Sequence, residues 1–255
     1  MTSELERAAA FEEAIRDACA ERVVETRFGP CLFNDTFDRI WNLNVLRAER
    51  PQGAAAEDIA AEAERVQGRA RLPHRRVLLP PDDDRLAAGF RALGWEGDHF
   101  LFMVRRREPE RQIRTEQVSE VQPGSLAPLR AAIVREWSPA SDDALVRQII
   151  ETDTLMWKAG NGRCFAVFAD GVPVSAAVLY SDGRSAQVED VATLPAHRGR
   201  GHASAVVGRA VAEARAAGHD FVFLVADGKN WPKELYRRLG FDDVGSRWAF
   251  LRRLP

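Results

Sequence analysis

The sequence predicts an α/β protein built from two related halves, and three observations support this fold class. Segments with helical spacing of apolar residues alternate with short runs typical of strands. The chain has 255 residues, a comfortable length for two small domains. An internal echo also joins the halves: A-L-G-W-E-G-D-H-F-L-F-M-V-R-R from Ala92 parallels R-L-G-F-D-D-V-G-S-R-W-A-F-L-R-R from Arg238. Since repeated units indicate a repeated fold, each copy should be a helix end, a glycine cap and a bent or paired strand.

Charge and cysteine content exclude several classes of protein. The net charge is only -2, so no bulk attraction to nucleic acid or to a membrane surface is expected. Apolar runs are much shorter than the ~20 residues that a bilayer needs, and charges interrupt the N-terminus too often for a signal peptide, which predicts a cytoplasmic protein. The 3 cysteines are too few for a disulfide framework, and the 5 histidines lack metal-ligand spacing. We therefore expect buried cysteines and no metal site.

The first half alternates helices and strands in a recognisable order. Three consecutive acidic residues follow Pro80-Pro81 and should cap the helix that ends at Gly94. The expected elements are a helix at 4–20, strand-like segments at 23–33 and 40–46, a helix at 56–70, a short strand at 76–79 and a helix from the acidic cap to Gly94.

The second half follows a charged linker, residues 105–115. Two D-G pairs, at Asp170 and Asp182, separate apolar runs and are strong hairpin signals. The expected elements are a strand at 114–121, helices at 126–137 and 144–158, strands at 164–169 and 174–180, a strand that carries Glu189, a helix from about 204, a strand at 221–226 and a last helix around 234–239.

One stretch, from Gln187 to Ser204, has the features of an anion-binding turn. It is predicted to be a strand, a turn containing Gly199 and Gly201, and then the first turn of an amphipathic helix. Glycine lets the backbone approach a ligand closely, and the N–H groups of a first helical turn have no partners within the helix. The helix dipole adds partial positive charge at the same place, so a phosphate or pyrophosphate is the expected ligand.

Two known patterns could account for this turn. The dinucleotide fingerprint G-x-G-x-x-G is matched only at its first two glycines, because Ser204 stands at the third, although Asp227 after the next strand keeps a dehydrogenase as an alternative. The other pattern is R-x-x-G-x-A, here Arg198, Gly201 and Ala203, which resembles motif A of the GNAT superfamily of acyl-CoA-dependent N-acyltransferases. A tyrosine four residues before Gly240-Phe241 resembles motif B of the same family and favours this second interpretation.

The resemblance implies a fold, a cofactor and a binding site. Each GNAT-like domain would be a mixed, mostly antiparallel twisted sheet flanked by helices, with the order β-α-α-β-β-β-α-β-α-β-β over residues 112–253. Acetyl-CoA would be the cofactor, its pyrophosphate held by the loop and its pantetheine arm paired with the strand before the loop. The implied binding residues are Val191, Ala192, Thr193, Arg198, Gly199, Arg200, Gly201, His202, Ala203 and Ser204.

Three residues are candidates for the chemistry. Tyr236 would be the general acid that protonates the departing thiolate, with a core tyrosine as the alternative. Amine acetylation also needs a proton acceptor, and Glu189 and Asp190 lie on the strand beside the thioester with side chains on opposite faces. We expect Glu189 to be the base or ammonium anchor and Asp190 to be the reserve, while a buried structural contact remains open for either. His197 and His202 should be exposed and neutral.

The acceptor site has weaker signals. The resemblance places Glu151, Asp153 and Trp157 where the family's second helix and following loop cover the acceptor, although these residues could equally form a solvated surface. The first half is expected to lack an R-x-x-G-x-A segment, because Leu79 leads through two prolines into acidic residues. We therefore expect residues 1–108 to be a shortened GNAT-like domain without a CoA loop and residues 112–255 to be the catalytic domain.

The predicted function is acetyl-CoA-dependent N-acetylation of a primary amine of a small molecule by direct attack, because no cysteine or serine is placed as an acyl carrier. The alternatives are acetylation of a protein or peptide N-terminus or lysine, and a non-catalytic acyl-CoA-binding sensor. Neither nucleic acid nor membrane is expected as a partner, and the chain would be a monomer or a homodimer.

Overall fold

A computed structural model describes residues 2–254, which divide into two compact units. The first unit comprises residues 2–102, 226–230 and 244–254, and the second comprises Met103–Val225 and Trp231–Asp243. Two segments from late in the chain, 226–230 and 244–254, belong to the first unit. A single boundary between residues 108 and 112 therefore does not separate the two units. The domain limits 1–108 and 112–255 stay a prediction.

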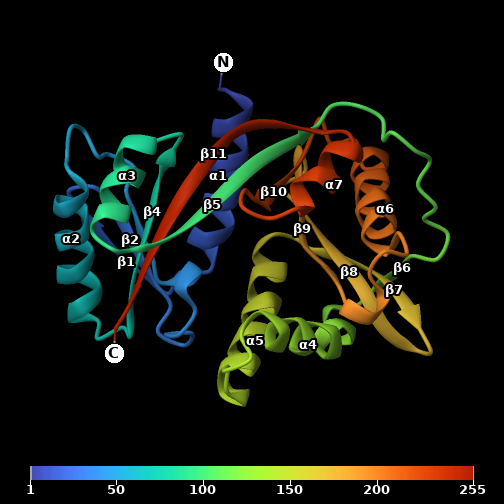
Figure 1. The fold of residues 1–255 in the computed structure, drawn as a ribbon, viewed down its shortest axis with the longest axis horizontal. Helices are drawn as coiled ribbons and strands as arrows, with labels where there is room; N and C mark the ends of the chain where they lie inside the picture. Colours follow the sequence, from blue (N-terminus) through green and yellow to red (C-terminus); the bar gives the residue numbers. More distant parts are fainter. Residues whose placement is uncertain (1, 255) are drawn as a thin grey trace. The chain divides into compact units, whose positions relative to one another are not determined.

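The first unit begins with a well-capped helix. The Ser3 hydroxyl accepts from the N–H of Glu6, whose carboxylate accepts in return from the Ser3 N–H. Figure 1 shows the elements that follow. They are α1 (Glu4–Ala18), β1 (Arg22–Thr26), β2 (Gly29–Phe33), β3 (Leu46–Arg47), α2 (Ala56–Arg69), β4 (His74–Pro81), α3 (Asp84–Ala92), β5 (Glu96–Arg105) and β11 (Phe241–Arg253).

The sheet of the first unit has the strand order β1-β2-β3-β4-β11-β5. β3 and β4 are parallel, whereas β1–β2, β2–β3 and β4–β11 are antiparallel. Helices α2 and α3 pack on this sheet through a hydrophobic core in which the side chains of Ile59, Phe90 and Phe250 are fully buried. The rings of Phe90 and Phe250 stack with their centroids 5.0 Å apart.

The strand expected at 40–46 is wrong except at Leu46, where the short strand β3 begins. Trp41–Leu43 form a 3-10 turn instead. The reason is the fully buried side chain of Asn44, whose amide donates to the carbonyls of Phe37 and Ile40 and whose oxygen accepts from the N–H of Asn34. These bonds satisfy backbone groups that a strand would have paired with a neighbour.

The second unit contains the remaining elements. The strand expected to begin at 114 begins only at Ser119. The elements are β6 (Ser119–Val121), a 3-10 turn (Pro123–Leu126), α4 (Ala127–Trp137), α5 (Asp143–Ala159), β7 (Arg163–Ala169), β8 (Val172–Ser181), β9 (Ser185–Thr193), a 3-10 turn (Pro195–His197), α6 (His202–Ala216), β10 (Phe221–Asp227) and α7 (Pro232–Arg238).

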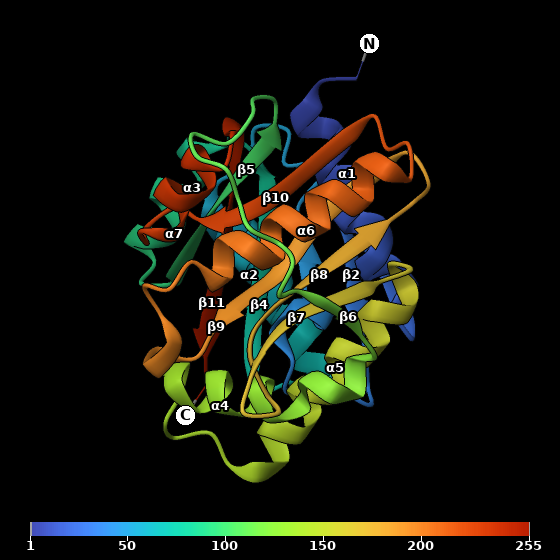
Figure 2. The same cartoon turned by 90° about the vertical axis from the view of Figure 1, so that its right-hand side faces the viewer.

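The sheet of this unit has the order β10-β9-β8-β7-β6. β10 and β9 are parallel and the other neighbours are antiparallel. Asp170 and Gly171 both have positive φ, at 50° and 77°, as a tight two-residue hairpin requires. Helix α6 crosses one face of β8 and β9 (Figure 2), while α4 and α5 lie on the other (Figure 1). The predicted mixed, mostly antiparallel sheet flanked by helices is confirmed.

The internal echo is confirmed as repeated structure. Gly94 and Gly240 both follow a helix with φ of 76° and 88°, and a strand comes next in each case. A side chain at Gly240 would stand 2.1 Å from the carbonyl oxygen of Arg107, so only glycine fits there. The two strands expected after the last helix are one bent strand, β11, with a register shift between Arg247 and Ala249.

The expectation that the first half lacks R-x-x-G-x-A is also wrong. Arg50, Gly53 and Ala55 match it, and they connect β3 to α2. In each unit a helix therefore crosses between two parallel strands, β3–α2–β4 in the first and β9–α6–β10 in the second. β3 has only two residues, too few to produce a strand signal in the sequence, which hid the correspondence.

No helix within residues 2–254 is both long and apolar enough to cross a bilayer.

Candidate active site

A β-bulge in β9 sets the geometry of the site. Glu189 faces Val178 of β8 and Ala192 faces Ala176, so Asp190 and Val191 together oppose the single residue Ala177. Asp190 has a φ of 52°, a left-handed conformation that few residues other than glycine adopt. A bulge bends its strand and redirects side chains, and it is common beside active sites. Here it places Glu189 and Asp190 in different surroundings.

The end of β9 has a free edge. The ladder between β9 and β10 runs from Ser185–Phe221 to Val188–Leu224, whereas β9 continues to Thr193. In the described part of the chain, Val191, Ala192 and Thr193 therefore have no strand partner on the β10 side. The other side is well held, because the Ser175 hydroxyl donates to the carbonyl of Ala192. An extended ligand could pair with this edge as an added strand would.

The loop after β9 leads into an open helix start. Gly199 and Gly201 have φ of 74° and 81°, and nothing lies within 4 Å of where a side chain would begin at either. Gly201 is the N-cap of α6 and supplies no side chain to cap it, and the first turn contains no acidic residue. The N–H groups of His202, Ala203 and Ser204 are therefore free of side-chain acceptors within the described residues, which suits an anion.

Two arginines and two histidines surround this helix start. Arg198 donates from Nε to the Thr193 carbonyl (3.0 Å) and from a terminal nitrogen to Glu136 of α4 (2.7 Å), which holds the loop in place. Arg200 is exposed. His197 and His202 are half-buried rather than exposed, and the Nδ1 atom of each is buried without a hydrogen-bond partner. Burial, followed by the charges of His197 and Arg200, lowers the pKa of His202, which favours the neutral ring.

Tyr236 lies on α7 with only 8% of its surface exposed. Its ring meets that of Phe241 edge-on, at 6.4 Å between centroids. Burial, and then the nearby Glu189 carboxylate, raises the pKa of Tyr236 above its ordinary value. The hydroxyl therefore stays protonated at neutral pH, as a general acid must. Glu189 accepts a 2.6 Å hydrogen bond from the side-chain amide of Gln187.

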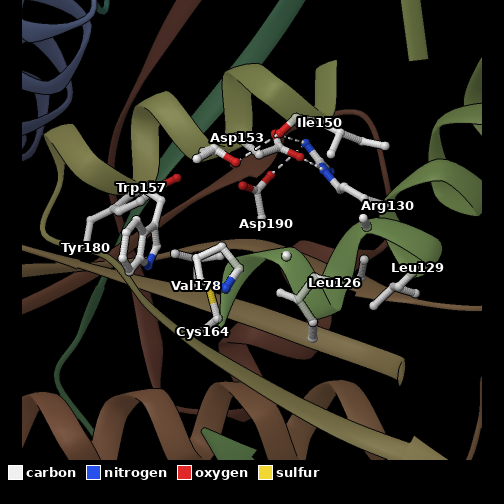
Figure 3. Close-up of a pocket in the computed structure, with 16 residues that line it drawn as sticks. Leu126, Leu129, Arg130, Ile150, Asp153, Trp157, Cys164, Val178, Tyr180 and Asp190 are labelled. Carbon is white, nitrogen blue, oxygen red and sulfur yellow. Dashed lines mark hydrogen bonds and ion pairs between the residues drawn. The ribbon is translucent and has the colours of Figure 1, made fainter. Parts of the chain in front are cut away.

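Three charged side chains near the bulge form a cluster that we call the Arg130 triad: Arg130 of α4, Asp153 of α5 and Asp190 of β9. Arg130 binds Asp153 through two hydrogen bonds, of 2.6 and 2.9 Å, and pairs with one oxygen of Asp190 at 3.2 Å. Figure 3 shows this cluster at one end of a cavity, with Trp157, Tyr180 and Cys164 toward the other.

The cavity has a volume of about 70 Å³ and is mostly apolar apart from the triad. Its walls come from the 3-10 turn, α4, α5 and the strands β7, β8 and β9. They are Pro123, Gly124, Leu126, Ala127, Leu129, Arg130, Ile150, Asp153, Thr154, Trp157, Cys164, Ala176, Val178, Tyr180, Asp190 and Ala192.

Burial and mutual charge set the protonation of the triad. Burial opposes the charge on Arg130, but Asp190 and Asp153 outweigh it and raise the pKa of the guanidinium further. Burial, and then the negative charge of Asp190, raises the pKa of Asp153 to about 6 in spite of the contact with Arg130. At neutral pH the triad thus carries two negative charges and one positive charge.

Some of the residues that the sequence predicts for the acceptor site line this cavity. Asp153 and Trp157 line it, whereas Glu151 is exposed on the same helix and does not. Asp190 also belongs to it. Arg130 was missed, although an arginine between Leu129 and the apolar run 131–134 in a predicted helix is a signal that it could be buried and paired.

Glu189 does not line the cavity, but it faces the cavity residue Val178 across β8 and β9 and therefore lies on the same face of the sheet. The expectation that the side chains of Glu189 and Asp190 lie on opposite faces is wrong, because the bulge inserts a residue between Glu189 and Ala192 and breaks the alternation.

Comparisons with known proteins agree with this geometry. Residues 126–241 match the model of the acetyltransferase (GNAT) family. A functionally unknown conserved protein from Staphylococcus epidermidis has a similar fold, with a TM-score of 0.71, 14% identity and coverage of 92% of this chain and 95% of that chain. A GCN5-related N-acetyltransferase from Kribbella flavida has a TM-score of 0.61, 19% identity and coverage of 96% and 93%.

A tandem GNAT protein from the clavulanic acid biosynthesis pathway has a TM-score of 0.52, 14% identity and coverage of 82% of this chain and 75% of that chain. At such identities these structures share the fold alone. No curated protein sequence matches the chain.

Proposed function

The chain carries a GNAT acetyltransferase domain and is an acyltransferase, and from this premise we propose that it moves the acetyl group of acetyl-CoA to a primary amine of a small molecule by direct attack. The observation that carries the cofactor assignment is the open start of α6 directly after the free edge of β9. The start of α6 would bind a diphosphate through its N–H groups and the helix dipole, and the edge of β9 would pair with an extended amide-containing arm.

The residues present fit coenzyme A. Backbone N–H groups from Gly199 to Ser204 would take the diphosphate, with Arg200 nearby to balance its charge. The edge formed by Val191, Ala192 and Thr193 would take the pantetheine amides. Acetyl-CoA supplies the acetyl group as an activated thioester. No carboxylate in the first turn of α6 competes for this place or repels the ligand.

Tyr236 is proposed as the general acid. As the amine nitrogen bonds to the acetyl carbon, the carbon–sulfur bond breaks and the sulfur needs a proton. The Tyr236 hydroxyl is protonated at neutral pH and can donate this proton to the departing thiolate. A proton lost by the amine would pass to Glu189, which is close enough to Tyr236 to raise the pKa of its hydroxyl.

Direct attack is favoured over an acyl-enzyme. All 3 cysteines are buried, and burial raises the pKa of Cys164 to about 12 and that of Cys19 to about 11. A buried thiol with a raised pKa is a poor nucleophile at neutral pH. The amine itself is therefore proposed to attack, held in position by the enzyme.

Two measurements test this function. Titration calorimetry should detect binding of coenzyme A to the full chain, and acetyl-CoA should be consumed in the presence of amines from a diverse panel that includes peptides. Absence of coenzyme A binding would refute the proposal. Binding without transfer to any amine would instead identify a sensor, and transfer confined to peptides would identify a protein acetyltransferase.

A further inference from the structure

We propose that the cavity holding the Arg130 triad is the acceptor pocket, and that it selects a primary amine entering as its ammonium form, with one compact apolar body and no anionic group. This inference rests on the proposed acetyl transfer and deepens it, because it names the class of acceptor. It stands on the charge of the triad, the size and lining of the cavity, and the position of Asp190 on β9.

The charge of the triad calls for a cation. Two carboxylates share one guanidinium, and the exposed fractions of the three side chains are 17% for Arg130, 26% for Asp153 and 25% for Asp190. One negative charge is therefore left uncompensated in a largely desolvated place, where an unpaired charge is costly. An ammonium group would neutralise it, whereas a carboxylate or phosphate on the acceptor would add to it.

The triad also has acceptor atoms to spare. Arg130 uses its Nε and one terminal nitrogen on Asp153, and the same terminal nitrogen reaches Oδ1 of Asp190. Oδ2 of Asp190 has no partner among the described residues. A carboxylate can accept about four hydrogen bonds, so Asp190 retains capacity to accept from an ammonium group.

The size of the cavity limits the rest of the acceptor. A volume of 70 Å³ corresponds to about five to seven water positions, at roughly 10–15 Å³ each. Displacing that much water leaves space for a group near the size of one aromatic ring. The lining is suited to an apolar body, because Trp157, Val178 and Tyr180 form much of the wall. A long polyamine or a folded peptide would extend beyond the cavity.

The location links the pocket to the chemistry. Asp190 is adjacent to Glu189 and precedes the strand edge proposed for pantetheine, and the bulge turns its side chain into the cavity. Ala192, one of the proposed pantetheine residues, also lines the cavity. An amine held by Asp190 would therefore lie beside the strand that positions the thioester.

The test compares matched amines and matched variants in the full chain. Phenylethylamine has the expected charge and body, phenylalanine adds a carboxylate to it, and spermidine is a longer polyamine. We expect kcat/KM for phenylethylamine to exceed that for phenylalanine and for spermidine by at least tenfold. Equal or better use of phenylalanine or of spermidine would overturn the proposal.

Asp190→Asn is the informative variant because asparagine also tolerates the left-handed backbone and keeps the shape of the side chain. We expect KM for phenylethylamine to rise at least tenfold, with the affinity for coenzyme A unchanged. Glu151→Gln is the control, since it removes one charge from the exposed surface of α5 without touching the cavity, and it should leave KM unchanged. Equal effects of the two variants would overturn the proposal.

A second variant tests the space rather than the charge. Ala176→Leu would fill the cavity and should weaken phenylethylamine more than ethylamine, and circular dichroism would show whether it folds. Calorimetry with phenylethylamine on the coenzyme A complex gives a readout that needs no turnover. Failure of coenzyme A to bind refutes the proposed function, whereas normal coenzyme A binding with no phenylethylamine binding refutes the pocket alone. If coenzyme A does not bind, phenylethylamine is titrated into the free protein instead. Binding there would support the pocket, and absence of binding would refute it.

Discussion

The two parallel crossovers of this molecule share a sequence pattern but differ where the helix begins. Both loops match R-x-x-G-x-A, and the glycine has a φ of 78° at Gly53 and 81° at Gly201. Helix α6 begins directly after Gly201, whereas the N-cap of α2 is Ala55, two residues beyond Gly53. In α2 the Asp58 carboxylate accepts from the N–H of Ala55, and α6 has no such acid.

This difference teaches that the spacing of a motif does not by itself make an anion site. In the first unit the protein's own carboxylate occupies the helix start, and Glu57 adds a second negative charge there. Both residues of β3 are paired with β4, so β3 also lacks the free edge that β9 has. The internal echo shows a third difference, because Phe90 stands where Tyr236 stands in the second unit.

The largest expected effect comes from replacing Tyr236 of the second unit by phenylalanine, the residue that the first unit has at the corresponding position. Tyr236→Phe removes the hydroxyl and keeps the buried ring, so turnover should fall about 100-fold, in line with the usual contribution of ~10²–10⁴ from acid–base catalysis. Steady-state kinetics with acetyl-CoA and an accepted amine would measure it. Coenzyme A affinity should barely change, and an unaltered kcat would remove Tyr236 from the mechanism.

Transplanting the acid of α2 into α6 should close the proposed cofactor site. Ser204 is the third residue of α6, the position that Asp58 has in α2. Ser204→Asp should raise the Kd for coenzyme A about 30-fold, because a carboxylate would compete for the N–H groups and repel the diphosphate, a change of roughly 2 kcal/mol. Calorimetry would measure this, with the neutral Ser204→Asn as the matched control. Equal affinities of the two variants would argue against a diphosphate at this helix.

The pH dependence of acceptor binding sharpens the comparison, because the Arg130 triad belongs to the second unit. The titratable groups around it are Arg130, Asp153, Asp190, Tyr180 and Cys164, and Asp153 has a pKa of about 6. Protonation of Asp153 would cancel the net negative charge. KM for phenylethylamine should therefore rise about tenfold as pH falls from 7 to 5.

The matching variant is Asp153→Asn, which removes the titrating group. Its KM should already be high at pH 7 and should change little down to pH 5. A variant that kept the full pH dependence would show that another group titrates.

The smallest effect is expected from opening the helix start of the first unit. Asp58→Ser removes the carboxylate that holds the Ala55 N–H and should lower the stability of this unit by about 0.5–1 kcal/mol, or Tm by roughly 2–4 °C. Thermal unfolding followed by circular dichroism would measure it. The affinity for coenzyme A should remain as in the unaltered chain. A second binding site in this variant would show that the carboxylate alone had kept the loop closed.

Local signals account for what was predicted well. The D-G hairpins, the helix starts and the glycine loop before α6 depend on residues close together in the chain, whose backbone preferences the sequence states directly. The same reasoning failed at 40–46, because Asn44 is held by partners such as Asn34 that a local pattern does not include. It also misplaced β3, which is a strand only because β2 and β4 lie beside it.

The sequence by itself determined the α/β character, the glycine turn before α6 and the tyrosine near the last helix, since each follows from the conformational limits of neighbouring residues. Only the tertiary structure decided that Asp190 turns toward Arg130 and Asp153, because this depends on a bulge in the register of β9 with β8 and on helices distant in the chain. Only it showed that one of two similar loops is filled by a carboxylate of its own helix while the other is open.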